Sequence, residues 1–535
     1  MLVLSAVSPG VRLRFYAITL IITFCPFAHF SAAQDVLTYH NNIARTGLDS
    51  TERQLTLTNV NSSTFGLLFV LPADGLVDAQ PLYVSAVNVN GATHNVAIVA
   101  TEHDSVYGYD ADTGTALWHI STLGSGETTS DNRGCSQVSP EIGITSTPVV
   151  YRPKSGNPIV YVVAMSKDSS GDYHQRLHAL DVTSGAELNG GPVEISGKYP
   201  GTGDNSVNGY VIFDPAQYKE RSGLLLLGNT VFLTWASHCD FRPYTGWIMG
   251  YNVSTLQQNT ILNLTPNGNE GAVWGSGAGM AADTSGNIFL LDANGVFDTT
   301  LNGSGFPNEG DYGNAFLKIT ASGGLKVADY FEMYNGVSES DNDYDLGSGG
   351  TLLTNQRDSN GKLWQLAVGA GKDSNLYVVD RTNLGKFNAK GNNIYQELSG
   401  VLPGGIWSMP AAGGSNVYYG PVNGPILEFQ FRNAKLLSSP VAQTSVSFPF
   451  PGATPSISSN GLQNAIVWAA ANVKPAVLYA FNAQSLQMIY NSNQASGGRD
   501  HFGNGNKFIT PTIANGKVYV GSQTGVGVFG LLSEK

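Results

Sequence analysis

Short runs of apolar residues rich in Val, Ile, Tyr and Thr recur along the chain, and Gly, Asn, Asp and Ser separate them. Long stretches with the spacing of an amphipathic helix and a charged face are nearly absent. Short runs of this composition, bounded by turn-forming residues, are typical of β-strands. The pattern therefore predicts an all-β fold.

One unit of sequence repeats, and its clearest copy spans Val96 to Trp118. This copy contains an apolar strand, a turn, a second strand and the segment Asp110-Ala-Asp-Thr-Gly114 before Trp118. Eight segments open such units: QPLYV from Gln80, STPVVY from Ser146, GYVIFDP from Gly209, WGSGAGMAAD from Trp274, GSGGTLL from Gly347, WSMPAAG from Trp407, ATPSIS from Ala453 and ITPTIA from Ile509. Their spacing of roughly 45 to 75 residues fits four-stranded sheets with inserted loops.

These units predict one eight-bladed β-propeller. Seven blades is the alternative, because the third unit matches the repeat least well. The last unit lacks a fourth strand after Leu532, and the segment from Ser63 to Pro72 can supply it. The two ends of the chain would then close the ring, which leaves few open sheet edges. His40 and Arg45 are expected to fasten the N-terminal segment.

The first 33 residues have the layout of a secretory signal peptide. Arg12 and Arg14 precede the apolar run from Phe15 to Phe30, and small residues at 31–33 offer a cleavage point. An uncleaved anchor is the alternative, although the run is short for a membrane span. We therefore expect a single domain at 34–535, secreted or periplasmic, with no membrane span after cleavage.

The charge of the chain limits the classes of molecule that it can bind. Charged residues make up 13% of the chain and the formal net charge is −12, which disfavours nucleic acids and anionic membranes as partners.

Cys25 lies in the predicted signal peptide, so Cys135 and Cys239 remain. In an oxidising compartment these two either form one disulfide or include a buried thiol.

The stretch of residues 341–381 groups several chemically active side chains. It opens with three aspartates at spacing two, Asp341, Asp343 and Asp345, whose carboxylates an extended backbone would point to one side. Two apolar runs follow, 363–370 and 376–379, and they predict a hairpin with Lys372 at its turn. Two or three carboxylates and one lysine therefore belong to a single sheet, unless they form a solvated acidic turn.

The sequence Asp-x-x-Thr-Gly-x-x-x-Trp that ends at Trp118 resembles the tryptophan-docking repeat of the quinoprotein propellers. These are the pyrroloquinoline quinone (PQQ) dehydrogenases and their non-enzymatic relatives. The resemblance covers most of the mature chain and by itself implies only the fold. Four segments also resemble parts of the cofactor site: Gly271 to Gly295, Asn342 to Leu353, Gly371 to Arg381 and Gly405 to Pro421.

This resemblance implies roles for individual residues. Trp274 would lie beneath the quinone, Asn294 and Asp343 would bind Ca²⁺, Asp343 or Asp345 would be the catalytic aspartate, Lys372 would contact the quinone oxygens, and Trp407 would lie near the axis. PQQ is a flat tricarboxylate, which suits an aromatic floor, cations and a metal. Ca²⁺ takes oxygen ligands and polarises the quinone carbonyl, while the aspartate removes the alcohol proton.

The chain also departs from these dehydrogenases. Where they carry two adjacent cysteines over the quinone, Cys135 stands alone near Glu141. Their third-blade glutamate, a calcium ligand, has no clear match, and there is no haem domain. The corresponding unit instead offers a polar cluster that suits a sugar or uronate: His238, Asp240, Arg242 and Tyr244.

The leading functional hypothesis is a secreted quinoprotein-like oxidoreductase that uses PQQ and Ca²⁺. Its substrate would be a small alcohol or carbohydrate, and an extracellular acceptor would take the electrons. One alternative is a non-catalytic propeller that binds protein or glycan. The other is a polysaccharide-degrading propeller, of the lyase type, that uses His238, Arg242 and Tyr244.

Overall fold

The computed structural model of the protein describes residues 34–533. Within this range the regular structure is almost entirely β: one six-residue α-helix, α1 (Gly336–Asp341), and four short 3₁₀ turns accompany the strands. The predicted all-β class is confirmed. No helix among the described residues is long and apolar enough to cross a membrane. The predicted signal peptide lies outside these residues.

Eight of the sheets in residues 34–533 have four or more strands. The first sheet contains β3 (Leu82–Val89), β4 (Ala92–Ala100), β5 (Ser105–Asp110) and β6 (Ala116–Ser121). The second contains β7 (Thr128–Asp131), β8 (Glu141–Ile142), β9 (Val149–Tyr151), β10 (Ile159–Lys167), β11 (Tyr173–Asp181) and β12 (Val193–Glu194). The third contains β17 (Leu225–Leu227), β18 (Thr230–Thr234), β20 (Trp247–Asn252) and β21 (Gln258–Asn263), and the fourth contains β22 (Ala281–Ala282), β23 (Asn287–Leu291), β24 (Phe316–Thr320) and β25 (Lys326–Phe331). The fifth sheet contains β26 (Leu352–Arg357), β27 (Leu363–Ala370), β28 (Leu376–Asp380) and β29 (Gln396–Leu398), and the sixth contains β30 (Ala411–Gly413), β31 (Asn416–Tyr419), β32 (Pro425–Arg432), β33 (Lys435–Leu436) and β34 (Ala442–Ser447). The seventh contains β1 (Leu48–Asp49), β35 (Ser456–Asn460), β36 (Gln463–Ala471), β37 (Val477–Asn482) and β38 (Met488–Asn491). The eighth contains β2 (Phe65–Pro72), β39 (Thr512–Ala514), β40 (Lys517–Ser522) and β41 (Gly525–Leu531). The smaller elements are β13 (Lys198–Pro200), β14 (Ser206–Val207), β15 (Tyr210–Ile212), β16 (Tyr218–Lys219), β19 (Ala236–Ser237) and the 3₁₀ turns η1 (Pro215–Gln217), η2 (Gly275–Gly277), η3 (Leu346–Ser348) and η4 (Ser496–Gly498).

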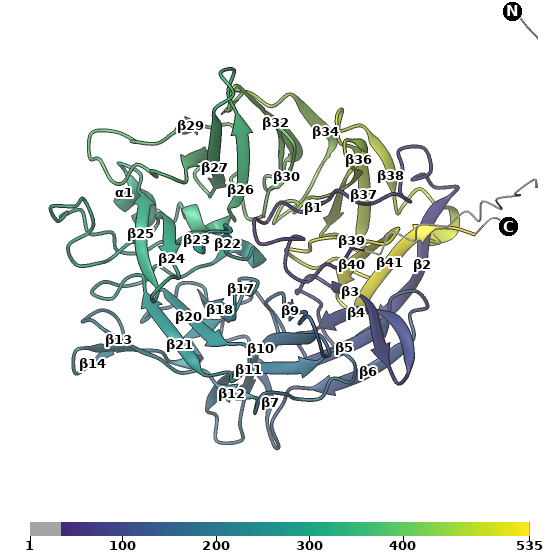
Figure 1. The fold of residues 1–535 in the computed structure, drawn as a ribbon, viewed down its shortest axis with the longest axis horizontal. Helices are drawn as coiled ribbons and strands as arrows, with labels where there is room; N and C mark the ends of the chain where they lie inside the picture. The colour runs from purple at the N-terminus through teal and green to yellow at the C-terminus, as the bar shows by residue number, and fades with distance from the viewer. Residues whose placement is uncertain (1–33, 534–535) are drawn as a thin grey trace, which may run out of the picture. The chain divides into compact units, whose positions relative to one another are not determined.

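The large sheets lie around a common centre (Figure 1) and pack on one another through apolar side chains. One buried cluster, for example, joins Leu366 of β27 and Val378 of β28 to Phe429 of β32 in the next sheet. Strand β28, whose two faces are both covered, is accordingly a nearly continuous apolar run. The predicted hairpin of β27 and β28 is confirmed, with Lys372 in the connection.

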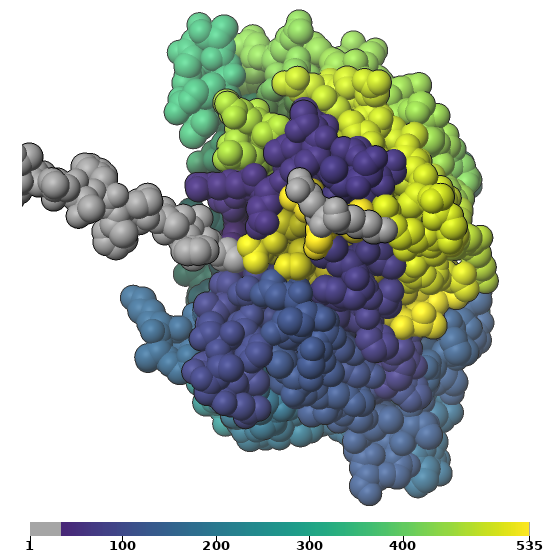
Figure 2. Space-filling view, turned by 90° about the vertical axis from the view of Figure 1, so that its right-hand side faces the viewer, coloured from purple at the N-terminus to yellow at the C-terminus, as the bar shows by residue number. Residues whose placement is uncertain are grey.

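The two ends of the described chain share one sheet. Strand β2 pairs antiparallel with β41, from Phe65 opposite Leu531 to Pro72 opposite Gly525. N-terminal residues (purple) accordingly lie against C-terminal residues (yellow) in Figure 2. The predicted pairing of the 63–72 segment with the last unit is therefore confirmed.

Residues 36–49, which we call the hub segment, run past the first strand of most sheets. Their carbonyl groups accept hydrogen bonds from β9, β22, β26, β30 and β35, for example from Leu353 N to Ala44 O at 2.9 Å. The buried Arg45 guanidinium donates to the carbonyl oxygens of Met280 at 2.8 Å and Leu224 at 3.1 Å. His40 and Arg45 thus fasten the N-terminal segment, as expected.

Two predictions about local structure were wrong. The segment from Gly209 does not open the third large sheet: β15 belongs to a small three-stranded sheet with β13 and β14, and β17 opens the large one. The backbone from Asp341 to Asp345 is also not extended. Asp341 ends α1 and Asp343 has a φ of 61°, so the three carboxylates do not share one face.

Candidate functional site

Loops that precede or connect the strands meet at one pocket. Four residues predicted from the resemblance line it: Trp274, Asp345, Lys372 and Trp407. The remaining lining residues are Gln137, Asp240, Ser348, Phe450, Lys507 and Phe508. Because these residues come from both ends of the chain and from its middle, no single segment forms the site.

Lys372 lies between two aspartates. Its ammonium is 2.5 Å from Asp343 Oδ1 and 2.5 Å from Asp345 Oδ2. The two carboxylates differ in exposure, since the Asp345 side chain is 8% exposed and that of Asp343 is 68% exposed. Burial raises the pKa of Asp345 although Lys372 opposes the shift. Burial alone would lower the pKa of Lys372, but Asp345 and Asp343 raise it above its usual value.

Asn294 joins the same cluster. Its backbone N–H donates to Asp345 Oδ1 at 2.8 Å, and its Nδ2 donates to Asp343 Oδ1 at 2.9 Å. Its side-chain oxygen is buried and has no hydrogen-bond partner within residues 34–533. The site therefore contains one buried oxygen atom that a cation or donor from a ligand could satisfy.

The rest of the pocket wall is aromatic. Phe450 lies 6.1 Å from Trp407 and 6.3 Å from Phe508, measured between ring centroids, and both contacts are edge-to-face. The Lys372 ammonium is 5.9 Å from the Trp407 ring centroid. Trp274 and Trp407 are only half-buried. Flat faces next to a cation suit a planar anionic ligand.

Behind this wall lie two buried cations that no sequence motif indicates, Lys219 and Arg221. Lys219 is 1% exposed, 4.9 Å from the Trp274 ring centroid, and donates to Gln137 Oε1 at 3.0 Å. Arg221 is 2% exposed and 4.2 Å from the Phe508 ring centroid. Its nearest carboxylate partner, Asp78, is 3.9 Å away, and its Nε and Nη1 have no hydrogen-bond partner in the described chain.

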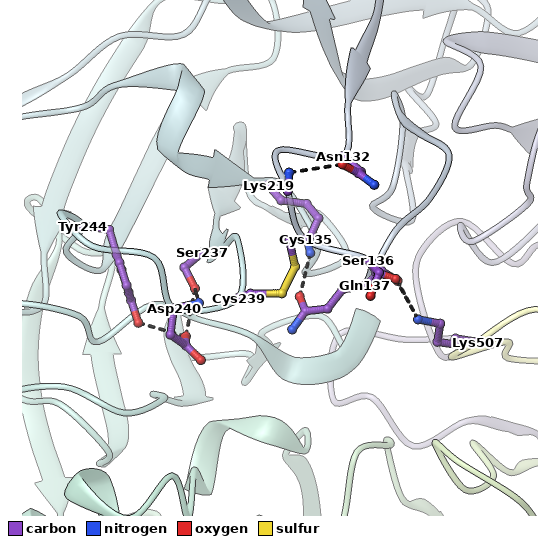
Figure 3. The surroundings of a disulfide bond; sticks show 11 residues. Asn132, Cys135, Ser136, Gln137, Lys219, Ser237, Cys239, Asp240, Tyr244 and Lys507 are labelled. Carbon is purple, nitrogen blue, oxygen red and sulfur yellow. Dashed lines mark hydrogen bonds between the residues drawn. A yellow bond between two sulfur atoms is a disulfide. The ribbon is translucent and has the colours of Figure 1, made fainter.

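A disulfide joins Cys135 to Cys239, which settles the alternatives left open by the sequence. Figure 3 shows that the bond lies between Gln137 and Asp240, two residues of the pocket wall. The same loop is held from the other side, because Lys507 donates to the carbonyl oxygen of Gln137 at 3.0 Å. The disulfide therefore ties together two loops that bound the pocket.

The alternative polar cluster does not converge on one ligand site. Arg242 forms two hydrogen bonds with Asp204, at 2.9 and 2.8 Å, and Tyr244 donates to Asp240 at 2.9 Å. His238 is buried, and burial followed by repulsion from Lys219 lowers its pKa to about 3. Of the four residues only Asp240 lines the aromatic pocket.

The oxygen atoms near Lys372 are of the type that binds calcium, but there are few of them. The two aspartates and Asn294 Oδ1 are oxygen ligands of the kind that Ca²⁺ prefers. Among residues 34–533, however, no group of three or more His, Cys, Asp or Glu side chains is arranged to hold a metal. Since the Lys372 ammonium already lies between the two carboxylates, a divalent cation could use them only in competition with it.

Lys219 makes the free energy of unfolding of the protein depend on pH. Burial, followed by repulsion from Arg221, lowers its pKa from 10.5 to about 7. Between these values the unfolded chain keeps a proton that the folded chain has lost, so the free energy of unfolding rises with pH across this window. We expect Lys219→Met to be more stable than the parent at about pH 6, and this advantage to shrink toward about pH 10.

Urea unfolding at several pH values measures this difference. Lys198→Met, which removes an exposed lysine, is the matched control and should show no such trend. A stability difference for Lys219→Met that stays constant with pH would show that the folded-state lysine titrates normally.

Comparisons with known proteins agree with this fold. No protein-family model and no curated protein sequence matches the chain. The solved quinohemoprotein alcohol dehydrogenase of Comamonas testosteroni is 14% identical, with a TM-score of 0.60 over 94% of this chain and 81% of that chain. The quinohemoprotein alcohol dehydrogenase ADHIIG of Pseudomonas putida HK5 is 12% identical, with a TM-score of 0.61 and the same coverages, 94% and 81%. A europium-containing methanol dehydrogenase is 11% identical, with a TM-score of 0.57 over 91% of this chain and 89% of that chain. At these identities the likeness establishes the fold alone, which is that of the quinoprotein propellers.

Proposed function

We propose that the chain is a PQQ-dependent oxidoreductase that acts on an alcohol or a sugar. In this proposal the fold is an eight-bladed propeller closed by β2, residues 1–33 direct it out of the cytoplasm, and an extracellular acceptor takes the electrons. The observation that carries the proposal is the pocket in which Trp274 and Trp407 meet the Asp345–Lys372 pair. A flat anion fits both the aromatic walls and the cation.

Two lysines of the pocket wall support a ligand with acidic groups. Lys372 and Lys507 line the pocket, and Lys507 donates to the backbone carbonyl oxygens of Ser136 and Gln137 rather than to a carboxylate. Hydrogen bonds from an ammonium to a carboxylate are stronger than those to a neutral acceptor. PQQ, as a flat tricarboxylate, would offer such groups.

Asp345 is the residue placed to act as the general base. Its raised pKa makes it a stronger base than an exposed aspartate, and it lines the pocket where a substrate hydroxyl would lie. When bound, the quinone would supply the acceptor for two electrons. Lys372 would stabilise negative charge that develops at the ligand edge. It also connects the buried Asp345 to the exposed Asp343, which offers the proton a way to solvent.

A divalent cation would be held by Asn294 Oδ1 and the two aspartates and would polarise the ligand carbonyl. Because the Lys372 ammonium occupies the space between these carboxylates, we expect Lys372→Met to bind Tb³⁺, a luminescent Ca²⁺ analogue, at least about tenfold more tightly than the parent. Luminescence sensitised by the neighbouring Trp407 reports this binding.

Lys362→Met, at the opposite end of the same hairpin, is the matched control and should behave like the parent. Equal Tb³⁺ affinity of the parent and Lys372→Met would show that the ammonium does not compete with a metal. Absence of sensitised luminescence in both proteins would remove the metal from the proposal.

Reconstitution with PQQ and Ca²⁺, followed by dye reduction with a panel of alcohols and sugars, tests the function itself. Asp345→Asn should keep PQQ affinity within about threefold while turnover falls by at least about 100-fold. Asp341→Asn, an exposed aspartate from the same acidic stretch, should be neutral. PQQ binding without turnover on any substrate would instead support the non-catalytic binding propeller.

A further inference from the structure

A second polar pocket lies at the other end of the β27–β28 hairpin from the candidate site. Lys372 precedes β28, whereas Arg381 directly follows it, so the length of the strand separates them. This pocket has a volume of about 240 Å³ and lies between the sheets of β22 and β26, next to Ile43 and Ala44 of the hub segment. It shares no residue with the candidate site.

The Arg381 guanidinium lines this pocket and is poorly compensated. Its side chain is 7% exposed, yet its Nε has no hydrogen-bond partner within residues 34–533. Its Nη2 donates to Asn355 Oδ1 at 2.5 Å, and its nearest carboxylate partner, Asp283, is 4.0 Å from Nη1. Burial lowers the pKa of Arg381 despite this carboxylate. The position therefore lacks a close anion.

Asp283 does not serve as that anion, because its carboxylate is used within its own turn. It accepts hydrogen bonds from the backbone N–H groups of Ser285 at 2.9 Å and Asn287 at 3.0 Å, and from Asn287 Nδ2. The remaining polar wall consists of hydroxyl and amide side chains: Thr284, Ser285, Thr354, Asn355 and Gln365. Such groups donate and accept hydrogen bonds, as the hydroxyl groups of a ligand require.

We propose that this pocket binds a small hydroxylated carboxylic acid, with the carboxylate on Arg381 and the hydroxyl groups on the surrounding hydroxyl and amide side chains. A carboxylate forms charge-assisted hydrogen bonds with a guanidinium, and the guanidinium of Arg381 has its nearest carboxylate partner only at 4.0 Å. The site is independent of the proposed redox function. Occupation would also link two sheets to the hub segment, so the ligand should stabilise the fold.

Calorimetric titration of the purified protein with gluconate, acetate and glucose tests the proposal. Gluconate carries both the charge and the hydroxyl groups, and it should bind more tightly than acetate, while glucose should not bind. Arg381→Gln should weaken gluconate binding by at least about tenfold. Arg357→Gln, an exposed arginine at the end of the neighbouring strand β26, should leave the affinity unchanged.

Two further variants keep the test decisive. If Arg381→Gln does not fold, Gln365→Ala, which alters a more exposed wall residue, should weaken gluconate binding several-fold. Lys372→Met should not affect gluconate, which separates this pocket from the candidate redox site. The proposal is overturned if gluconate does not bind, or if folded Arg381→Gln binds it as tightly as the parent.

Discussion

Removal of residues 34–75 is expected to lower the melting temperature sharply, by about 10 °C or more. The deletion takes away β2, which pairs with β41, and the hub segment, which contacts the first strands of most sheets. Strand β41 would lose its partner strand and become an open sheet edge, and backbone groups in several other sheets would lose their hydrogen bonds to the hub segment. Thermal unfolding followed by circular dichroism measures the change.

A pair of point variants in β2 isolates the contribution of the strand. Phe65 is fully buried against Trp468, Tyr490 and Phe529, so Phe65→Ala should cost about 3 to 5 kcal/mol. Leu68 lies in the same strand but is 37% exposed, and Leu68→Ala should cost far less. An unchanged melting curve for the truncated chain would contradict the role assigned to this segment.

Trp274→Ala is expected to weaken PQQ binding by at least about tenfold, and to affect binding more than folding. Trp274 is half-buried and lines the pocket together with Lys372 and Trp407, so its loss removes a flat face rather than a fully packed core side chain. Lys372→Ala should mainly reduce turnover, because it removes the cation at the ligand edge. Quinone absorbance and dye reduction separate the two effects.

Trp364→Ala is the matched control, since this tryptophan is also half-buried but packs on Tyr395 outside the pocket. It should leave PQQ affinity unchanged. If Trp274→Ala lowers stability without changing PQQ affinity, Trp274 is a packing residue and the pocket is not a quinone site.

Apolar runs and the repeat predicted strand pairing, and the family resemblance predicted residues of the pocket. The hairpin around Lys372 followed from two apolar runs bounded by turn residues, whereas the pairing of β2 with β41 followed from the missing fourth strand of the last repeat unit. Trp274, Asp345, Lys372 and Trp407 were identified by resemblance, and all four line one pocket. The Asp341–Asp345 segment was predicted wrongly because spacing two indicates a strand only if the backbone is extended, and here a helix ends within it.

The buried cations were missed because tertiary contacts decide their burial. Lys219, Glu220 and Arg221 form a charged run that by itself suggests a solvated strand, yet all three are buried. The surrounding side chains, among them Trp274 and Phe508, come from distant parts of the sequence. For Arg242, closeness in the sequence suggested a shared ligand site with His238, Asp240 and Tyr244. In the structure Arg242 instead pairs with Asp204, which lies in another loop.

Titration of the purified protein with PQQ, in the presence of Ca²⁺, tests the central claim most directly. The pocket lies within reach of two tryptophans, so tryptophan fluorescence and quinone absorbance should change together and saturate at one PQQ per chain. We expect a Kd in the micromolar range or below and weaker binding to Trp274→Ala. No saturable change in either signal, or equal binding to the parent and Trp274→Ala, would contradict a quinone site in this pocket.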